Sequence, residues 1–220
     1  MSLEELFSWL ATILAIGQQL TGIQICKRII KDRKSDSVQF FPFVAMFTSC
    51  TVWLRYGILR EDSAIIIVNI CGSTLQFIYC FTYYIFTKQK SVVNKQITIG
   101  LFMLFPILIY TRFISPTRES AVATLGLYCC TVSVISYGSP LSSVKQVIRT
   151  QSTSVMSFPL VAFNVVLGGL WFIYGIIRHD KYIQVPNFIG FILGCLQASL
   201  FVLYPSRSSR TINAKSTVVI

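Results

Sequence analysis

In 220 residues, 54% are hydrophobic and only 12% are charged, whereas about a quarter of the residues of a soluble domain carry charge. This deficit excludes an ordinary soluble domain and means that much of the surface faces something other than water. The net charge of +11 would suggest nucleic acid in a soluble protein. Here it indicates basic loops on one side of a membrane, so we expect a lipid bilayer and no nucleic acid as partner.

Apolar stretches of about 20 residues, long enough to cross a bilayer as helices, recur along the chain. The predicted spans are Leu6–Cys26, Phe40–Leu59, Ala64–Phe86, Gln96–Phe113, Ala121–Val144, Phe158–Ile177 and Tyr182–Tyr204. Pro106 interrupts the fourth span, and the polar residues after Pro205 are expected to form a disordered cytosolic tail. The predicted fold class is an all-α integral membrane protein with seven transmembrane helices.

Lysine and arginine residues predict the orientation, because they favour cytosolic loops. One side of the predicted topology collects thirteen of them: Lys27, Arg28, Lys31, Arg33, Lys34, Lys88, Lys90, Lys95, Lys145, Arg149, Arg207, Arg210 and Lys215. The other side holds five: Arg60, Arg112, Arg118, Arg178 and Lys181. We therefore expect an extracellular or lumenal N-terminus and a cytosolic C-terminus. Arg55, in the second span, is expected to reach the membrane interface with its long side chain.

An internal repeat is the strongest signal in the sequence. Two blocks read W-x-x-Y-G-I-x-R-x-D and then, six residues later, N-x-x-G. Their paired residues are Trp53 and Trp171, Tyr56 and Tyr174, Asp62 and Asp180, and Asn69 and Asn187. Upstream, an S-x-S-V…F-P block ending at Pro42 matches one ending at Pro159. Apolar composition alone cannot place these residues at matched spacing, so we infer a duplication.

The duplication predicts how the chain is divided. Three-helix units joined directly would be inverted, because three is odd, and the extra fourth span restores a common orientation. The predicted regions are a first three-helix repeat at 1–90, a linker helix at 91–118, a second three-helix repeat at 119–205 and the tail at 206–220. The two repeats are expected to form parallel bundles joined by an inversion linker helix.

These paired blocks, together with Tyr137-Gly-Ser-Pro140-Leu, resemble the SWEET (MtN3/saliva) sugar transporters, and Val38-Gln-Phe-Phe-Pro42-Phe is similar to the animal branch. The resemblance covers roughly residues 6–205. It implies a facilitative, bidirectional uniporter for a glucose-type monosaccharide or a small disaccharide, working by alternating access. It places the protein in the plasma membrane or the Golgi.

The resemblance also implies roles for the paired residues. Substrate binding falls on Asn69, Asn187, Trp53 and Trp171. The outer gate falls on Tyr56, Tyr174 and Asp180, and the repeat adds Asp62. Helix bending falls on Pro42, Pro140 and Pro159, and the fourth position of the family's proline set is Gly22. Glycine permits a bend without enforcing one.

Structural interpretations of the same residues stay open. The two asparagines can be interhelical hydrogen-bond partners, worth about 1 kcal/mol each, and the two tryptophans can belong to an interfacial aromatic belt. Pro42 and Pro159 stand where a helix begins, a position at which proline is tolerated. Pro140 lies deep within the fifth span, where it removes a backbone hydrogen bond and is expected to kink the helix.

The chemistry of the apolar stretches favours transport over catalysis. All eight acidic residues lie at span ends or in loops, so the intramembrane carboxylate of a proton-coupled carrier is missing. His179 is the only histidine, and the seven cysteines form no metal-ligand pattern, so we expect no metal, no cofactor and no enzymatic activity. The open alternatives are a heptahelical receptor and an accessory membrane protein that has lost transport.

Two further partners are predicted. The C-terminal Val218-Val-Ile220 has the apolar character of a weak PDZ-type ligand. A homo-oligomer is compatible with the sequence, which does not fix the number of chains.

Overall fold

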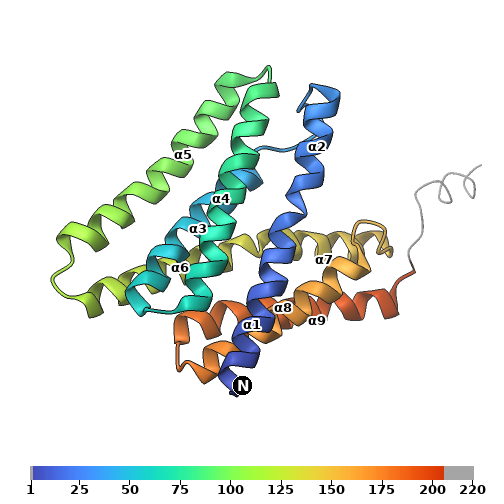
Figure 1. The fold of residues 1–220 in the computed structure, drawn as a ribbon. Coiled ribbons are helices and arrows are strands. Elements are labelled where there is room, and N and C mark those ends of the chain that lie inside the picture. Colours follow the sequence, from blue (N-terminus) through green and yellow to red (C-terminus); the bar gives the residue numbers. More distant parts are fainter. Residues whose placement is uncertain (1, 206–220) are drawn as a thin grey trace, which may run out of the picture. The chain divides into compact units, whose positions relative to one another are not determined.

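The computed structural model describes residues 2–205, and within that range every regular element is a helix. The predicted tail and the PDZ-type ligand lie outside the described residues. Contacts divide the chain into two compact units that meet between Val132 and Ser133. Each unit is described by itself (Figure 1).

The first unit begins with a helix that is broken near its middle. Its elements are α1 (Leu3–Leu20), α2 (Gly22–Asp32), α3 (Phe41–Arg60), α4 (Ser63–Phe86), α5 (Lys90–Ile109), the π-helical turn η1 (Tyr110–Ile114) and most of α6 (Arg118–Ser136). The chain starts α1 with a capping box, in which the Ser2 hydroxyl accepts from the Glu5 N–H and the Glu5 carboxylate accepts from the Ser2 N–H.

The second unit repeats part of this order. It contains the end of α6, then α7 (Gly138–Thr150), α8 (Phe158–Ile177) and α9 (Lys181–Leu203). In each unit two long helices joined by a tight turn pack against each other along their length, α3 with α4 and α8 with α9.

Six helical stretches are long and apolar enough to cross a membrane: Leu3–Asp32, Ser63–Phe86, Lys90–Ile114, Arg118–Thr150, Phe158–Ile177 and Lys181–Leu203. The seventh predicted span is α3, which has the length but is more polar because it carries Arg55 and Arg60. Large apolar side chains stay exposed on these helices, with Phe102 78% exposed. A bilayer accommodates such a surface, whereas water would not.

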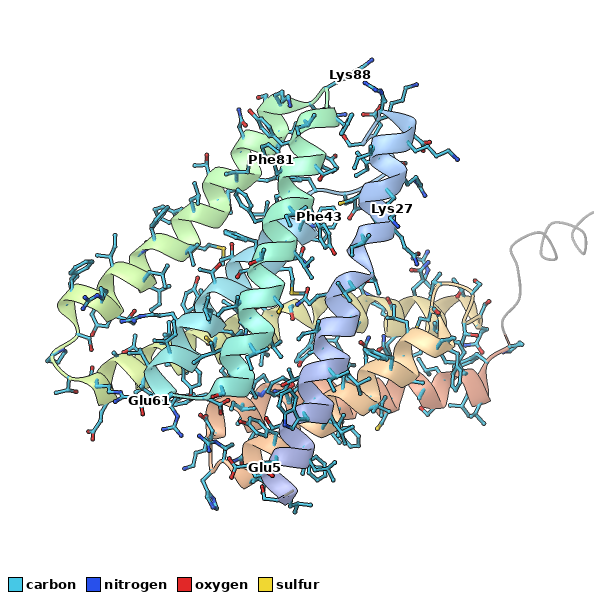
Figure 2. All side chains as sticks on the ribbon, viewed as in Figure 1. Glu5, Lys27, Phe43, Glu61, Phe81 and Lys88 are labelled. Carbon is cyan, nitrogen blue, oxygen red and sulfur yellow. The ribbon has the colours of Figure 1, made fainter. Side chains whose placement is uncertain are left out.

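Charged side chains lie at both ends of the first unit. Lys88 lies at one end and Glu5 and Glu61 lie at the other, whereas Phe43 and Phe81 lie between them, with Lys27 at about the level of Phe43 (Figure 2). Charged ends that flank an aromatic middle are typical of helices that cross an apolar layer.

Small apolar cores hold the helices of each unit together. In the first unit Ile29 of α2, Phe43 of α3 and Tyr83 of α4 belong to one buried cluster. In the second unit Val147 of α7 and Leu193 and Leu200 of α9 form another. The hairpins α3–α4 and α8–α9 are thereby fixed against the broken helix that accompanies each of them.

The predicted spans differ from the helices at their ends. The first helix continues to Asp32 and the fifth to Thr150, because both carry on as polar helices beyond the apolar stretch. Pro106 does not end α5, which runs through it to Ile109 before the π-helical turn. The Nη2 of Arg55 donates to the Thr111 carbonyl in that turn at 3.4 Å.

Candidate substrate site

The two asparagines adopt the same local geometry in their own units. Asn69 lies on α4 and Asn187 on α9, and both are half-buried. The Nδ2 of Asn69 donates to the Ile65 carbonyl at 2.8 Å, and the Nδ2 of Asn187 donates to the Ile183 carbonyl at 2.8 Å. Each amide is therefore held by its own helix with one N–H in use, and its carbonyl oxygen remains suited to accept from a hydroxyl group.

Each tryptophan of the repeat packs on the tyrosine one turn later. The rings of Trp53 and Tyr56 are 5.5 Å apart at an interplanar angle of 82°, and those of Trp171 and Tyr174 are 5.6 Å apart at 88°. Both tyrosines are buried and both tryptophans are half-buried. The edge-to-face contact fixes the indole and leaves part of it accessible, as a ring that stacks on a sugar requires.

The two aspartates begin the second helix of each hairpin. Asp62 Oδ1 accepts from the Ile65 N–H at 3.1 Å, and Asp180 Oδ1 accepts from the Tyr182 N–H at 3.0 Å. Both carboxylates are buried. Such N-caps stabilise a helix start by about 1 kcal/mol, so each aspartate has a structural role whether or not it also forms a gate.

Left-handed residues make the hairpin turns possible. Glu61 has φ 56° and His179 has φ 50°, and the N–H of the aspartate that follows each of them donates to the carbonyl of Gly57 or Gly175. A Cβ at Gly175 would lie 2.9 Å from the Gln184 backbone nitrogen. This glycine is therefore needed for the close approach of α8 and α9.

Two side chains that sequence reasoning did not select pack against the glycines of the N-x-x-G blocks. A Cβ at Gly72 would meet Gln19 Nε2 at 3.1 Å, and a Cβ at Gly190 would meet the Tyr137 hydroxyl at 2.4 Å. Gln19 precedes Gly22 by the same spacing that separates Tyr137 from Pro140. The repeat spacing was the signal that would have found them.

The four predicted bending positions fall into two kinds. Pro42 and Pro159 stand in the first turns of α3 and α8, which agrees with their interpretation as helix starts. Gly22 begins α2 directly after a break at Thr21, and Pro140 lies in the first turn of α7 after a break at Tyr137. The helix is thus interrupted three residues before Pro140 and directly before Gly22, and the bending roles of these residues stay predictions.

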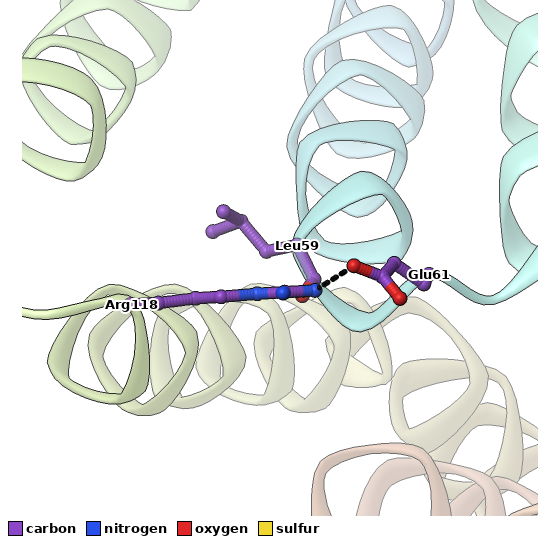
Figure 3. A network of polar contacts seen from close by, with 3 residues as sticks. All are labelled: Leu59, Glu61 and Arg118. Atoms are coloured by element: carbon purple, nitrogen blue, oxygen red, sulfur yellow. Dashed lines mark hydrogen bonds and ion pairs between the residues drawn. The ribbon is translucent and has the colours of Figure 1, made fainter.

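An arginine fastens α6 to the first hairpin (Figure 3). Arg118 donates through Nε and Nη2 to the Leu59 carbonyl at 3.0 and 2.8 Å, and its Nη2 lies 2.6 Å from Glu61 Oε1. The ion pair is exposed and contributes little by itself. The paired bonds to the carbonyl nevertheless fix where α6 begins.

Within residues 2–205 the histidine, cysteine and acidic side chains form no group of three that could hold a metal ion. The seven cysteines are free thiols. Apart from the aspartates that cap helices, the paired residues of the repeat offer amides, hydroxyls and indoles, which suit a neutral polar solute.

A family model described as "Sugar efflux transporter for intercellular exchange" matches the chain twice, over residues 5–91 and 123–209. The chain belongs to this family. The two matched segments contain all twelve predicted site residues. Because the same model matches twice, it supports the internal repeat. The family is one of transporters and not of enzymes.

Curated relatives carry the same family name. The chain is 39% identical to "Sugar transporter SWEET1" of Drosophila pseudoobscura pseudoobscura, covering 93% of this chain and 91% of that one. It is 31% identical to "Sugar transporter SWEET1" of Homo sapiens, with 94% of both chains covered. These relatives place it in the animal branch of the SWEET family.

A solved structure shares the SWEET fold. The structure titled "The 3.7 A resolution structure of a eukaryotic SWEET transporter" superposes with a TM-score of 0.80 at 22% identity, covering 91% of this chain and 98% of that chain. The fold class predicted from the sequence is confirmed by this likeness. The protein is a multi-pass membrane protein.

Proposed function

We propose that this chain is a facilitative, bidirectional sugar uniporter that works by alternating access. Its substrate is a neutral sugar, either a glucose-type monosaccharide or a small disaccharide. The names of the family and of its relatives support sugar transport. The binding residues are Asn69 and Asn187, with Trp53 and Trp171 beside them.

The positions of the acidic residues carry the uniport part of the proposal. They stand in first helical turns, at helix ends, in caps or in loops: Glu4, Glu5, Asp32, Asp36, Glu61, Asp62, Glu119 and Asp180. Coupling to protons requires an ionisable group at membrane depth, because such groups form the relay. Helices without one favour a solute that moves down its own gradient.

The repeat supports alternating access. In this proposal the outer gate is formed by Tyr56, Tyr174, Asp62 and Asp180. The breaks near Gly22 and Pro140 allow the helices to bend during the cycle, while Pro42 and Pro159 set the helix starts.

We further propose an extracellular or lumenal N-terminus, a cytosolic C-terminus and residence in the plasma membrane or the Golgi. The regions 1–90, 91–118 and 119–205 are the proposed first repeat, linker and second repeat.

Transport by the purified full chain in liposomes tests the proposal. Radiolabelled glucose should equilibrate in both directions, unlabelled sugar inside should accelerate uptake of label, and a protonophore should leave initial rates unchanged. Gly17→Ala is a suitable control variant, because a Cβ there meets nothing within 4 Å. Accumulation above the external concentration that a protonophore abolishes would refute uniport. A folded protein that moves no sugar would favour the receptor or accessory alternative.

A further inference from the structure

The first transmembrane helix is interrupted at Thr21 without a proline. There the Thr21 N–H donates to the Gln18 carbonyl at 3.2 Å, and the Gln24 N–H donates to the Thr21 carbonyl at 3.3 Å. Both bonds span three residues, whereas an α-helix uses four. Gly22 allows this tightened turn but does not cause it, so another group must hold the helix open.

A tyrosine from α4 occupies the break. The Tyr79 hydroxyl donates to the Gln19 carbonyl at 3.0 Å. In a continuous α-helix the Ile23 N–H would bond directly to the Gln19 carbonyl. The hydroxyl therefore occupies the carbonyl that the Ile23 N–H would use, and a side chain that enters the helical hydrogen-bond ladder is a known cause of sharp kinks.

Packing keeps this hydroxyl in place. Tyr79 is 2% exposed, and its ring lies 5.9 Å from the ring of Phe43. A Cβ on Gly22 would lie 2.3 Å from the Tyr79 ring, so the ring fills the space that a side chain at position 22 would take. One turn earlier on α4, Gln76 Nε2 donates to Gln19 Oε1 at 2.9 Å. The end of α1 is thus held twice by the same face of α4.

The second unit makes its break by other means. Pro140 has no N–H, so it cannot donate to the Ser136 carbonyl as a helix would require. Gln197 of α9 stands at the position that corresponds to Tyr79 in the repeat, and its Nε2 donates to the Pro140 carbonyl at 3.4 Å. The corresponding side chain reaches the break in both units, but only the first unit needs it to make the break.

We propose that Tyr79 is a positioning residue that holds the first helix bent at Gly22, doing with a hydroxyl group what Pro140 does covalently in the second unit. Its consequence for transport rests on the proposed uniporter function. Removing the hydroxyl allows the Ile23 N–H to bond to the Gln19 carbonyl, which straightens α1 and α2 and slows the cycle.

The test uses the full chain and compares Tyr79→Phe with Tyr83→Phe. Tyr83 is a matched control, because it is a buried tyrosine of α4 whose hydroxyl donates to the Val38 carbonyl at 3.1 Å, away from the break. In Tyr79→Phe, amide hydrogen exchange at Ile23 should slow by about tenfold, a factor that corresponds to about 1.4 kcal/mol. In Tyr83→Phe it should not slow. Exchange at Ile23 that is faster or unchanged in Tyr79→Phe would overturn the proposal.

A rescue experiment places the residues of the second unit, Gln197 and Pro140, at the corresponding positions 79 and 22 of the first unit. Tyr79→Gln should lower the maximal transport rate, and adding Gly22→Pro in that background should restore it, because proline breaks the helix without help from α4. If Gly22→Pro fails to restore fast exchange at Ile23 and Gln24, or fails to restore the rate, the proposal is overturned. If the unaltered chain carries no sugar, the uniporter function fails, whereas the exchange experiment still decides the role of Tyr79.

Discussion

The hairpins of the two units are alike, whereas their first helices are not. In α3–α4 and α8–α9 the same tryptophan packs on the same tyrosine, the same aspartate caps the second helix, and the same asparagine donates to its own helix. The broken helices differ: the interruption at Thr21 lies against Tyr79 in the first unit, and the interruption at Tyr137 precedes Pro140 in the second. The residues proposed to act in pairs are therefore the same in both hairpins, whereas the two interruptions involve different residues.

Substitution of either asparagine should give the largest effect on transport. If only one of the two substitutions impaired binding, the hairpins would not be functionally equivalent. Either Asn69→Ala or Asn187→Ala should remove about 1–3 kcal/mol of substrate interaction, because sugar hydroxyls lose a partner. Affinity should fall about tenfold or more, and transport should nearly cease. Sugar binding to purified protein, normalised to the folded fraction, measures this.

Asn94→Ala on α5 is the control for the asparagines, since Asn94 is exposed outside both hairpins. Its binding and stability should match those of the unaltered chain. If the asparagines serve only as structural hydrogen-bond partners, stability should fall and transport should scale with the amount of folded protein. Unaltered affinity in both Asn→Ala variants would remove the binding assignment even if cells lost transport.

Pro140→Ala should give the next largest effect on transport. It tests whether the break in the second unit depends on its proline, unlike the break in the first unit. The new N–H can bond to the Ser136 carbonyl and join α6 to α7 as one straight helix, so the maximal rate should drop several-fold while protein levels survive. Pro42→Ala should change the rate less, because Pro42 only begins α3. Equal losses in initial-rate assays, with normal folding, would show that the helix-start interpretation of Pro42 is incomplete.

The aspartate caps should give the smallest effect, and they separate a cap from a gate. Asp62→Ala or Asp180→Ala should cost about 1 kcal/mol of stability, and Asp→Asn should cost much less because asparagine caps equally well. The melting temperature in detergent measures the stability that the cap contributes. The transport rate measures whether the carboxylate also takes part in gating. Asn variants that keep both full stability and full rate would show that these carboxylates cap helices without gating.

Most of the fold could be predicted from hydropathy and the repeat, because a bilayer imposes span length and matched motifs mark the duplication. The ends of the helices could not be predicted in this way. Hydropathy marks the part of a helix that lies in the apolar layer, whereas α2 and α7 continue as polar helices beyond it. The repeat marked the paired residues, and the resemblance to the SWEET family supplied their predicted roles. The bond between Tyr79 and Gln19 joins residues 60 apart in sequence, and only the packing of α4 against α1 brings them together. Pro186 lies inside α9, and the sequence around it gave no sign of a role.

The break at Thr21 also sets where the cations of α2 lie. The stretch Leu3–Asp32 has 30 residues and would reach about 45 Å as one straight rod, whereas the hydrocarbon layer is about 30 Å thick. We therefore expect Lys27, Arg28 and Lys31 to lie among lipid headgroups, where each cation near an anionic surface gains about 1 kcal/mol. A change in the bend angle moves these cations through that layer, so we expect the lipid charge of the leaflet to bias how far the helix bends.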